Sequence, residues 1–287
     1  MMRHFTGFDM VCRNRYVVTV LFLFVCVVSY YQRSIRSTRL KSNEYNIITY
    51  TITSWFESLL FDTFAVNFFL TMSLKLYKMD LSPPACAAMM ICEIHDVPVE
   101  MIELNLMEKQ HLTTEYLKKN PMHTVPMLED GDLYIHDSHV ILTYLTDKYG
   151  KDDSLYPKDL KKRALVDQKI YFDVWFFLRV RNISYPAIFE GVRQPPEKVL
   201  NAVREAYDFL ETFLNKTEFV AADHMTVADV SLASTVSASR YVIPIDDKKY
   251  PKMQAWFSYM EKQPFYQKRT AAGSAKLKEI LLQHLDM

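Results

Sequence analysis

The chain has 287 residues, of which 49% are hydrophobic and 14% aromatic, so it is long enough for two domains with a substantial apolar core. Lysine plus arginine number 34, and aspartate plus glutamate also number 34, which makes the formal net charge zero. This balance argues against a nucleic-acid-binding protein and against an acidic interaction tail, so we expect no nucleic-acid partner.

The four cysteines, Cys12, Cys26, Cys86 and Cys92, form neither a C-x-x-C pair nor a histidine-flanked metal set. Cys86 and Cys92 are six residues apart in a predicted helix, which places them on opposite faces and argues against a disulfide between them. We therefore predict a reducing compartment, the cytoplasm, and no metal site.

The distribution of proline and glycine separates the first 71 residues from the rest of the chain. All 12 prolines lie at Pro83 or later, and residues 1–82 contain a single glycine, Gly7. Residues 1–71 therefore lack the turn-forming residues that a compact domain normally needs. We interpret them as an N-terminal extension and not as a domain.

Within this extension, Tyr16–Val28 is an uncharged apolar run with arginines on both sides. Its 13 residues would span about 20 Å as a helix, which is shorter than the hydrocarbon layer of about 30 Å. Three interpretations stay open. The run is the apolar region of a secretory signal, although no small-x-small cleavage site follows, or a short membrane anchor, or part of an over-extended gene model whose true start is Met72.

From Met72 onward, strands and helices alternate. Leu74–Tyr77 alternates in the manner of a strand, and Leu81–Pro84 forms a turn that opens a helix, because proline is tolerated in the first helical turn. Gly150 ends the last helix of this half. The predicted order is β-α-β-α-β-β-α, at residues 74–77, 83–94, 99–106, 112–119, 125–128, 133–135 and 137–149.

After a linker at residues 151–157, apolar residues recur at helical spacing and the strand patterns stop. Thr226 and Asp229 form a capping box, which serves folding and not function. We predict an α/β domain over residues 72–151 and an all-helical domain over residues 158–287. The helices of the second domain are expected at residues 158–181, 197–214, 226–239, 252–261 and 275–285.

The stretch Asn120–Leu128 contains a proline inside a short apolar strand. Because proline lacks a backbone N–H, Val125-Pro126 is expected to leave an edge open for something other than a neighbouring strand. The hairpin turn at Glu129–Asp132 and the helix start at Asp137-Ser138 follow, and a helix start favours anions. The pattern predicts a site for a peptide-like ligand that carries a carboxylate.

Six motifs occur in an order and spacing that are more specific than any one of them. They are Leu81–Pro84, Gln110–Thr113, Asn120–Leu128, Asp137–His139, Tyr149–Asp159 and Met225–Asp229. Together they make the region from Met72 to the C-terminus resemble a cytosolic glutathione transferase of the arthropod delta and epsilon classes. His111, His123 and the Leu155–Asp159 linker favour the epsilon class.

This resemblance implies a thioredoxin-like N-terminal domain that binds glutathione and a helical C-terminal domain that supplies the wall for a hydrophobic co-substrate. It implies a detoxifying homodimer that conjugates glutathione to hydrophobic electrophiles, with glutathione as co-substrate and no tightly bound cofactor. A non-catalytic binding protein of the same fold is the alternative. A glutaredoxin-like thiol transferase would need a cysteine at the position of Ser82.

Ser82 is the predicted catalytic residue. A cysteine thiol titrates near about 8.5, so a nucleophile at neutral pH needs a donor and a positive dipole to favour the thiolate. A serine hydroxyl at a helix N-terminus offers a donor, and the free backbone amides there offer a dipole. Spacing alone fits a plain helix cap as well. Tyr77 is the competing activator, but it falls within a strand pattern and is expected in the core.

The resemblance implies that a cis Pro126 holds Val125 so that its backbone pairs with the cysteinyl part of glutathione, as an added strand would. It implies that Asp137 faces the ligand's ammonium and that Ser138 and the helix amides meet the γ-glutamyl carboxylate. Relatives usually have glutamate at the position of Asp137, so the aspartate reaches one methylene less far. His111 and His123 are expected at the glycyl end.

Two features depart from the family pattern. Cys86 stands where many relatives have an arginine, which removes a possible charge partner, and neither Arg179 nor Arg181 is assigned to glutathione. Five aromatic residues are open to two interpretations, since they could line the co-substrate site but their helical spacing favours the core. They are Trp175, Phe176, Phe177, Tyr185 and Phe189.

Overall fold

A computed structural model describes residues 74–286 of the chain. The N-terminal extension, with the apolar run Tyr16–Val28 and its alternative interpretations, lies outside the described residues. None of the helices between residues 74 and 286 combines the length and the apolar sequence needed to cross a membrane.

A four-stranded mixed sheet, in the order β2-β1-β3-β4, forms the first part of the fold. Strand β1 pairs in parallel with β2 and antiparallel with β3, and β3 pairs antiparallel with β4. The register places Tyr77 opposite Met127, and Leu128 opposite Ile135. The strands are Leu74–Lys78 (β1), Val99–Glu103 (β2), Met127–Asp130 (β3) and Leu133–Ile135 (β4).

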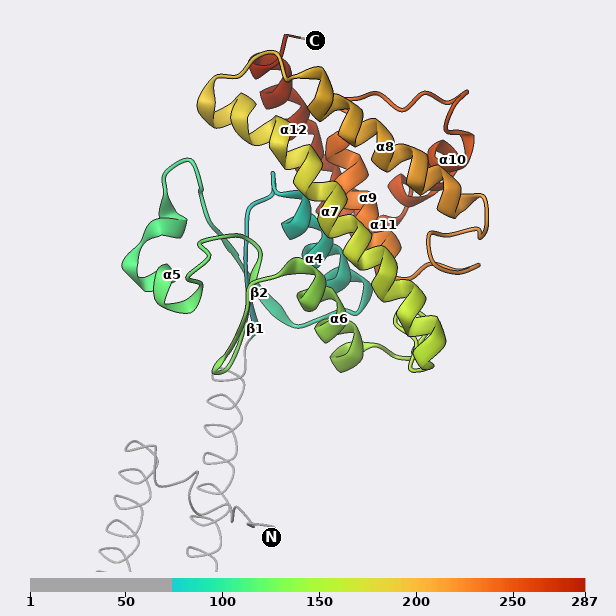
Figure 1. Cartoon of the computed structure of the whole chain (residues 1–287). Helices are drawn as coiled ribbons and strands as arrows, with labels where there is room; N and C mark the ends of the chain where they lie inside the picture. Colours follow the sequence, from blue (N-terminus) through green and yellow to red (C-terminus); the bar gives the residue numbers. More distant parts are fainter. Residues whose placement is uncertain (1–73, 287) are drawn as a thin grey trace, which may run out of the picture. The chain divides into compact units, whose positions relative to one another are not determined.

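Helices cover both faces of this sheet (Figure 1). Helix α4 (Pro83–Ile94) and helix α6 (Ser138–Tyr149) lie on the face toward the helical part, whereas the 3-10 turn η1 (Gln110–Leu112) and α5 (Thr114–Lys119) belong to the opposite side. All residues of α4 from Ala85 to Cys92 are buried, because this helix lies between the sheet and the bundle.

The second part is a bundle in which α9 is the central helix, with all 13 of its residues buried. Helices α4, α7, α10 and α12 pack around it. The bundle consists of α7 (Leu160–Glu190), α8 (Glu197–Leu214), α9 (Val227–Ser239), α10 (Pro251–Glu261), α11 (Pro264–Arg269) and α12 (Ala271–His284).

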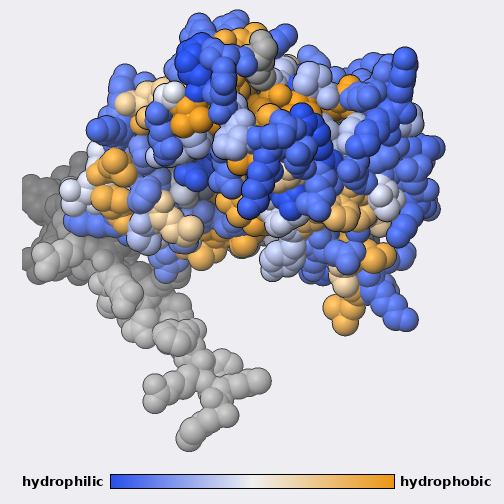
Figure 2. Space-filling view, turned by 45° about the horizontal axis from the view of Figure 1, so that its top comes forward, coloured by the Kyte–Doolittle hydropathy of each residue, from blue (hydrophilic) through white to orange (hydrophobic). Residues whose placement is uncertain are grey.

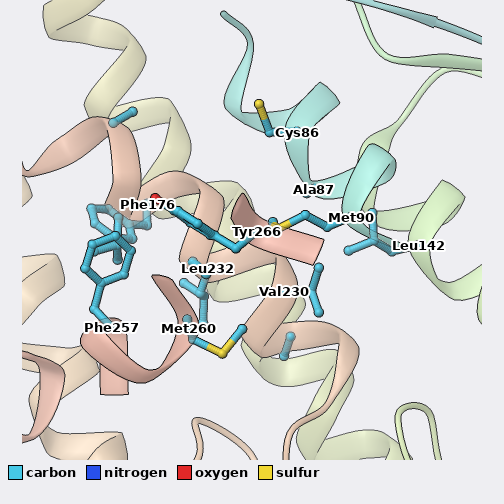
Figure 3. Packing of buried hydrophobic residues seen from close by; sticks show 14 of the residues in the cluster. Cys86, Ala87, Met90, Leu142, Phe176, Val230, Leu232, Phe257, Met260 and Tyr266 are labelled. Carbon is cyan, nitrogen blue, oxygen red and sulfur yellow. The ribbon is translucent and has the colours of Figure 1, made fainter. Parts of the chain in front are cut away.

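One continuous apolar core joins the sheet region to the bundle. Figure 3 shows side chains of different helices meeting in it, among them Met90 of α4, Leu142 of α6, Val230 of α9 and Tyr266 of α11. The face drawn in Figure 2 is largely hydrophilic, with hydrophobic areas between the polar side chains. These observations confirm the predicted fold class, a thioredoxin-like α/β part followed by an all-helical part.

Several predicted boundaries are wrong. The dipeptide Val125-Pro126 precedes β3 and does not lie in it, and β3 is paired on both sides, so it is not an edge strand. Helix α7 continues through Pro186 to Glu190, because aromatic side chains of its last turns help to form the wall of a pocket that Ser82 also lines. Helix α11 was not predicted, since its six residues are too few to show a helical period.

The capping box at the start of α9 is a saturated structural site. The Thr226 amide donates to Asp229 Oδ2 at 2.8 Å, as predicted. The second carboxylate oxygen accepts from the Val220 amide at 2.9 Å and from the Trp256 indole nitrogen at 3.0 Å. The fully buried Asp229 therefore ties the preceding loop and α10 to α9.

Candidate functional site

The strand register brings the predicted site residues to one end of the sheet. Strand β1 runs toward Ser82, and β3 begins beside the end of β1, so Val125 and Pro126 lie at the same end as Ser82. Strand β4 runs antiparallel to β3 and ends there too, which adds Asp137. The parallel strand β2 also ends on this side, and its following loop carries His111.

Ser82 is the N-cap residue of α4, with an extended backbone conformation. Its Oγ accepts from the Ala85 amide at 3.5 Å, which is at the limit of a hydrogen bond. Pro83 and Pro84 occupy the first two helical positions and have no N–H, so the free amides expected at this helix start are largely absent. The Ser82 hydroxyl is therefore the main donor at this end of α4.

The side chain of Ser82 faces an apolar pocket of about 160 Å³ between the α/β part and the bundle. The pocket combines the loops after β1 and β2 with α7, α9 and α12. Its lining residues are Met79, Leu81, Ser82, Pro83, Leu106, Met107, Phe177, Val180, Arg181, Ser184, Tyr185, Ile188, Phe189, Ala238, Leu277, Ile280 and Leu281. A mostly apolar wall with a few polar groups, the Ser82 hydroxyl among them, suits a small hydrophobic compound that reacts at one point.

Five aromatic residues were open to two interpretations, the wall of the co-substrate site or the core, and the structure places some of them in each role. Phe177, Tyr185 and Phe189 line the pocket. Phe176 is fully buried in the core. Trp175 packs against Phe209 and lies outside the pocket. The helical spacing of the set could not separate these roles, because α7 turns different faces to the core and to the pocket.

Tyr77 is engaged away from the pocket. Its hydroxyl donates to Glu129 Oε2 at 2.9 Å and accepts from Lys119 Nζ at 2.9 Å, and Lys119 also pairs with Glu129 at 2.7 Å. Burial and the Glu129 carboxylate raise the pKa of Tyr77, although Lys119 opposes them. Tyr77 is thus half-buried in a polar triad and not in the apolar core that was expected.

The Val125–Pro126 peptide bond is cis, as the resemblance implied. Both side chains are buried, and among the described residues no backbone group bonds the amide or the carbonyl of Val125. Two residues before Val125, His123 has a φ of 48°, in the left-handed region that non-glycine residues seldom adopt. The loop thus presents the backbone N–H and C=O of one residue, Val125, beside the start of β3.

Asp137 caps α6. Its Oδ1 accepts from the amides of His139 at 3.0 Å and Val140 at 3.1 Å. The side chain is 56% exposed, and Oδ2 accepts no hydrogen bond from the residues that the structure describes. The next residue, Ser138, is buried, with its Oγ 3.5 Å from the His139 ring.

His139 links this helix start to the bundle, which the sequence did not indicate. Its Nδ1 lies 3.4 Å from Asp137, and its Nε2 lies 3.1 Å from Oδ2 of Asp173 on α7. Asp173 also accepts from the Ser231 hydroxyl of α9. Burial lowers the pKa of His139, but the hydrogen bonds to Asp137 and Asp173 outweigh it and raise the pKa to about 9. The hydrogen bond from His139 in turn lowers the pKa of Asp137.

The rings of His111 and His123 lie together, with 6.1 Å between their centroids. Nδ1 of His111 is buried without a partner in the described part of the chain. Burial and the neighbouring His123 lower the pKa of His111. Two imidazoles that face each other at the end of the sheet can donate to an anion placed between them.

The two departures from the family pattern have structural explanations. Cys86 is buried, its thiol donates to the Asp80 carbonyl at 3.3 Å, and burial raises its pKa to about 12. Arg179 pairs with Glu205 at 2.7 Å and stacks on Trp175. Arg181 is exposed at the mouth of the pocket. Residues 74–286 contain no cluster of three or more His, Cys, Asp or Glu side chains suited to a metal ion.

A thioredoxin-like unit that delivers a serine hydroxyl to an apolar pocket against a helical bundle defines the architecture of a glutathione-dependent transferase. The sequence matches the N-terminal domain of glutathione S-transferases over residues 76–153 and their C-terminal domain over residues 168–264. The chain belongs to the glutathione S-transferase family.

Individual relatives support this assignment. The chain is 43% identical over 217 residues to glutathione S-transferase 1 of Manduca sexta, which covers 75% of this chain and all of the relative. It is similar to an epsilon-class glutathione S-transferase of the housefly, Musca domestica, with a TM-score of 0.72, 42% identity and coverage of 74% of this chain and 98% of the other.

A glutathione transferase homologue of Drosophila mojavensis was solved with bound glutathione. It shares 41% identity and a TM-score of 0.72 with this chain, over 75% of this chain and 98% of the other. These relatives confirm the resemblance to insect enzymes of the epsilon and delta type. They also favour a catalytic transferase over the non-catalytic alternative.

Proposed function

We propose that the protein conjugates glutathione to hydrophobic electrophiles in detoxification and that the Ser82 hydroxyl stabilises the glutathione thiolate. The observation that carries the proposal is the position of this hydroxyl, which faces an apolar pocket and makes only one weak hydrogen bond. The thiolate sulfur forms a bond to an electrophilic carbon. In substitution the leaving group departs with its electron pair, and in addition a proton completes the adduct.

The same proposal gives each remaining site residue a part of glutathione. The backbone N–H and C=O of Val125, next to the cis Pro126, pair with the cysteinyl backbone. The free carboxylate oxygen of Asp137 meets the γ-glutamyl ammonium, and Ser138 meets the carboxylate of that residue. His111 and His123 bind the glycyl carboxylate.

The decisive experiment compares Ser82→Ala with the wild-type protein in conjugation of glutathione to a chloronitroarene. Loss of a donor to developing negative charge is expected to lower kcat/KM by about 100-fold, with a smaller change in KM for glutathione. The matched control is Asp159→Ala, which removes the N-cap of α7, outside the pocket. Unchanged rates in Ser82→Ala would contradict the role given to Ser82.

A binding protein without catalysis remains the competing function to exclude. It predicts retention on immobilised glutathione without acceleration of conjugation for any of several electrophiles. Two features favoured this alternative, and neither supports it now. Cys86 is a buried packing residue, and Asp137 keeps an exposed carboxylate.

We further propose a homodimer. Exposed apolar side chains on two helices support it, with Val140 of α6 51% exposed and Tyr171 and Leu178 of α7 74% and 50% exposed. Tyr171 and Leu178 lie seven residues apart and therefore share a face of α7. Light scattering during gel filtration is expected to give twice the chain mass, and Val140→Lys with Tyr171→Lys is expected to give the monomer.

Location and domain limits also remain proposals. We propose a cytoplasmic protein, which the buried, unpaired thiols of Cys86 and Cys92 support. We propose a domain boundary in the linker at residues 151–157 and an N-terminal extension at residues 1–71. Intact mass and N-terminal sequencing of the native protein test the extension, and cell fractionation distinguishes a cytoplasmic protein from one anchored through Tyr16–Val28.

A further inference from the structure

Asp80 lies in the loop that connects β1 to Ser82, and it is held from several sides. Its carboxylate pairs with Lys78. Its amide donates to Glu103 at the end of β2 at 3.4 Å. Its carbonyl oxygen accepts from the Cys86 thiol at 3.3 Å. These contacts come from β1, β2 and α4, so Asp80 is fixed relative to the whole α/β part.

The C-terminal helix α12 presses on the same carbonyl through Gly273. A Cβ atom at this position would lie 1.9 Å from the Asp80 carbonyl oxygen and 2.8 Å from its carbon, both backbone atoms that cannot rotate away. Glycine in a helix costs about 1 kcal/mol relative to alanine. Close approach to Asp80 is the feature that requires glycine here, since the backbone of Gly273 is not in the left-handed region.

Asp80 sits inside the turn that places Ser82. The Ser82 amide donates to the Met79 carbonyl at 2.9 Å, so this turn encloses Asp80. Any displacement of the Asp80 carbonyl therefore moves the start of α4 and the Ser82 hydroxyl with it. Neither Gly273 nor Asp80 lines the pocket, which separates them from direct contact with a substrate.

The face of α12 that touches Asp80 continues as a wall of the pocket. Leu277 and Leu281 lie four and eight residues after Gly273, on the same side of the helix, and both line the pocket with Ser82. The far end of α12 is also tied, because Arg193 pairs with Asp286 at 2.7 Å. One rigid helix thus sets both the apolar wall and the loop that carries the thiol-activating hydroxyl.

We propose that Gly273 is a positioning residue for catalysis. By allowing α12 to lie directly on the Asp80 carbonyl, it holds the Ser82 loop where the hydroxyl donates to the glutathione sulfur. This inference rests on the proposed role of Ser82. It assigns a function in thiol activation to a residue of the helical part that touches neither glutathione nor the electrophile.

The test compares full-length Gly273→Ala with the wild-type protein. A shift of the Ser82 loop by a few tenths of an ångström to 1 Å is expected to lower kcat at least about tenfold. The pH profile of kcat/KM is expected to move toward the pKa of a free thiol, near about 8.5. The KM for glutathione is expected to stay within about twofold, because Val125 and Asp137 keep their positions.

Ala275→Gly is the control for changes in helix propensity, since Ala275 is exposed in the same helix and lies outside the pocket. It is expected to leave the pH profile unchanged. A folded Gly273→Ala protein with the wild-type profile and kcat overturns the proposal. Ser82→Ala is measured in parallel. If Ser82→Ala moves the profile and Gly273→Ala does not, only the positioning role fails, whereas no shift in Ser82→Ala removes the proposed function itself.

A second pair of variants decides the matter if Gly273→Ala does not fold. Cys86→Ala removes the donor that holds the Asp80 carbonyl from the side of α4, whereas Cys86→Ser keeps a donor there. Cys86→Ala is expected to shift the pH profile in the same direction by a smaller amount, and Cys86→Ser to restore it. Identical wild-type profiles in both variants contradict the proposal.

Discussion

Helix α6 has an aspartate at its N-cap and helix α9 has one in its first turn, and both accept hydrogen bonds from nearby backbone amides, but the two carboxylates differ in what else they meet. Asp229 is fully buried, and its two oxygens accept from two amides, a hydroxyl and an indole. Asp137 uses one oxygen for the helix and exposes the other, with 56% of its side chain accessible. A saturated carboxylate stabilises the fold, and a half-used one is available to a ligand.

The pKa values of Asp229 and Asp137 are also shifted in opposite directions. Burial raises the pKa of Asp229 to about 6, because four donors do not fully compensate for the lost water. The hydrogen bond from His139 lowers the pKa of Asp137, so this carboxylate stays ionised near neutral pH. Both aspartates lie at a helix start, and solvent exposure decides which one suits recognition of an ammonium.

The largest expected effect concerns the buried carboxylate. Asp229→Ala leaves two amides and the Trp256 indole without an acceptor, so we expect a loss of about 3–5 kcal/mol in the free energy of unfolding. Urea denaturation measures this loss. The kcat/KM of the protein that remains folded is expected to change less than about twofold. A loss below about 1 kcal/mol would show that α9 does not depend on this cap.

The second prediction uses pH to compare the two helix starts. The pKa of His139 is about 9 in the folded protein, above the value of about 6.5 expected when unfolded. Its contribution is therefore fully present below about pH 6.5 and is lost as pH rises through about 9, a difference of about 3 kcal/mol. We expect the unfolding midpoint of the wild type to fall over this range more steeply than that of His139→Gln. Parallel curves for the two proteins would contradict the link between α6 and α7.

The third prediction separates capping from recognition at α6. Asparagine caps helices as well as aspartate does, so Asp137→Asn is expected to keep the cap and to lose only the charge contact with His139, at a cost of about 1 kcal/mol in the free energy of unfolding. Loss of the charge is expected to raise the KM for glutathione about tenfold. Asp137→Glu, which keeps the charge, serves as the control. Equal KM values for Asp137→Asn and the wild type would remove the ammonium contact.

The smallest effect extends the comparison from carboxylates to hydroxyls. The Tyr77 hydroxyl donates a hydrogen bond to Glu129 and accepts one from Lys119, whereas the Ser82 hydroxyl makes one weak hydrogen bond among the described residues. Tyr77→Phe is expected to cost about 1 kcal/mol in stability and to leave kcat/KM within about twofold. Steady-state conjugation kinetics check this. A loss of activity comparable to that of Ser82→Ala would make Tyr77 the activator.

Much of the fold was predictable because its signals are local. Strand alternation, capping residues and helical periods located most elements, and the order of six short motifs indicated the family before any contact was known. Helix α7 was cut short at Arg181 since Pro186 and aromatic residues give no clear period, yet packing against the pocket keeps the helix going to Glu190. Tertiary contacts outweighed the local sequence there.

The site was predictable as a set of residues but not as an arrangement. Ser82, Val125 and Asp137 were found by motif, and the strand register then shows why they share one end of the sheet. His139 was not among the predicted site residues. Its role depends on Asp173, which lies 34 residues further along the chain, and no local pattern reports such a contact. The Asp137–His139 motif was the only available signal.

The two buried cysteines matter for the proposed function, in which the substrates are electrophiles that alkylate thiols. Burial raises the pKa of Cys86 and of Cys92 to about 12 each, so at neutral pH only about one thiol in 100,000 is ionised at either position. Both side chains are also inaccessible. Under the proposed function, electrophiles that enter the pocket meet the glutathione thiolate, whereas these two thiols escape alkylation even though Cys86 lies one helical turn from Ser82.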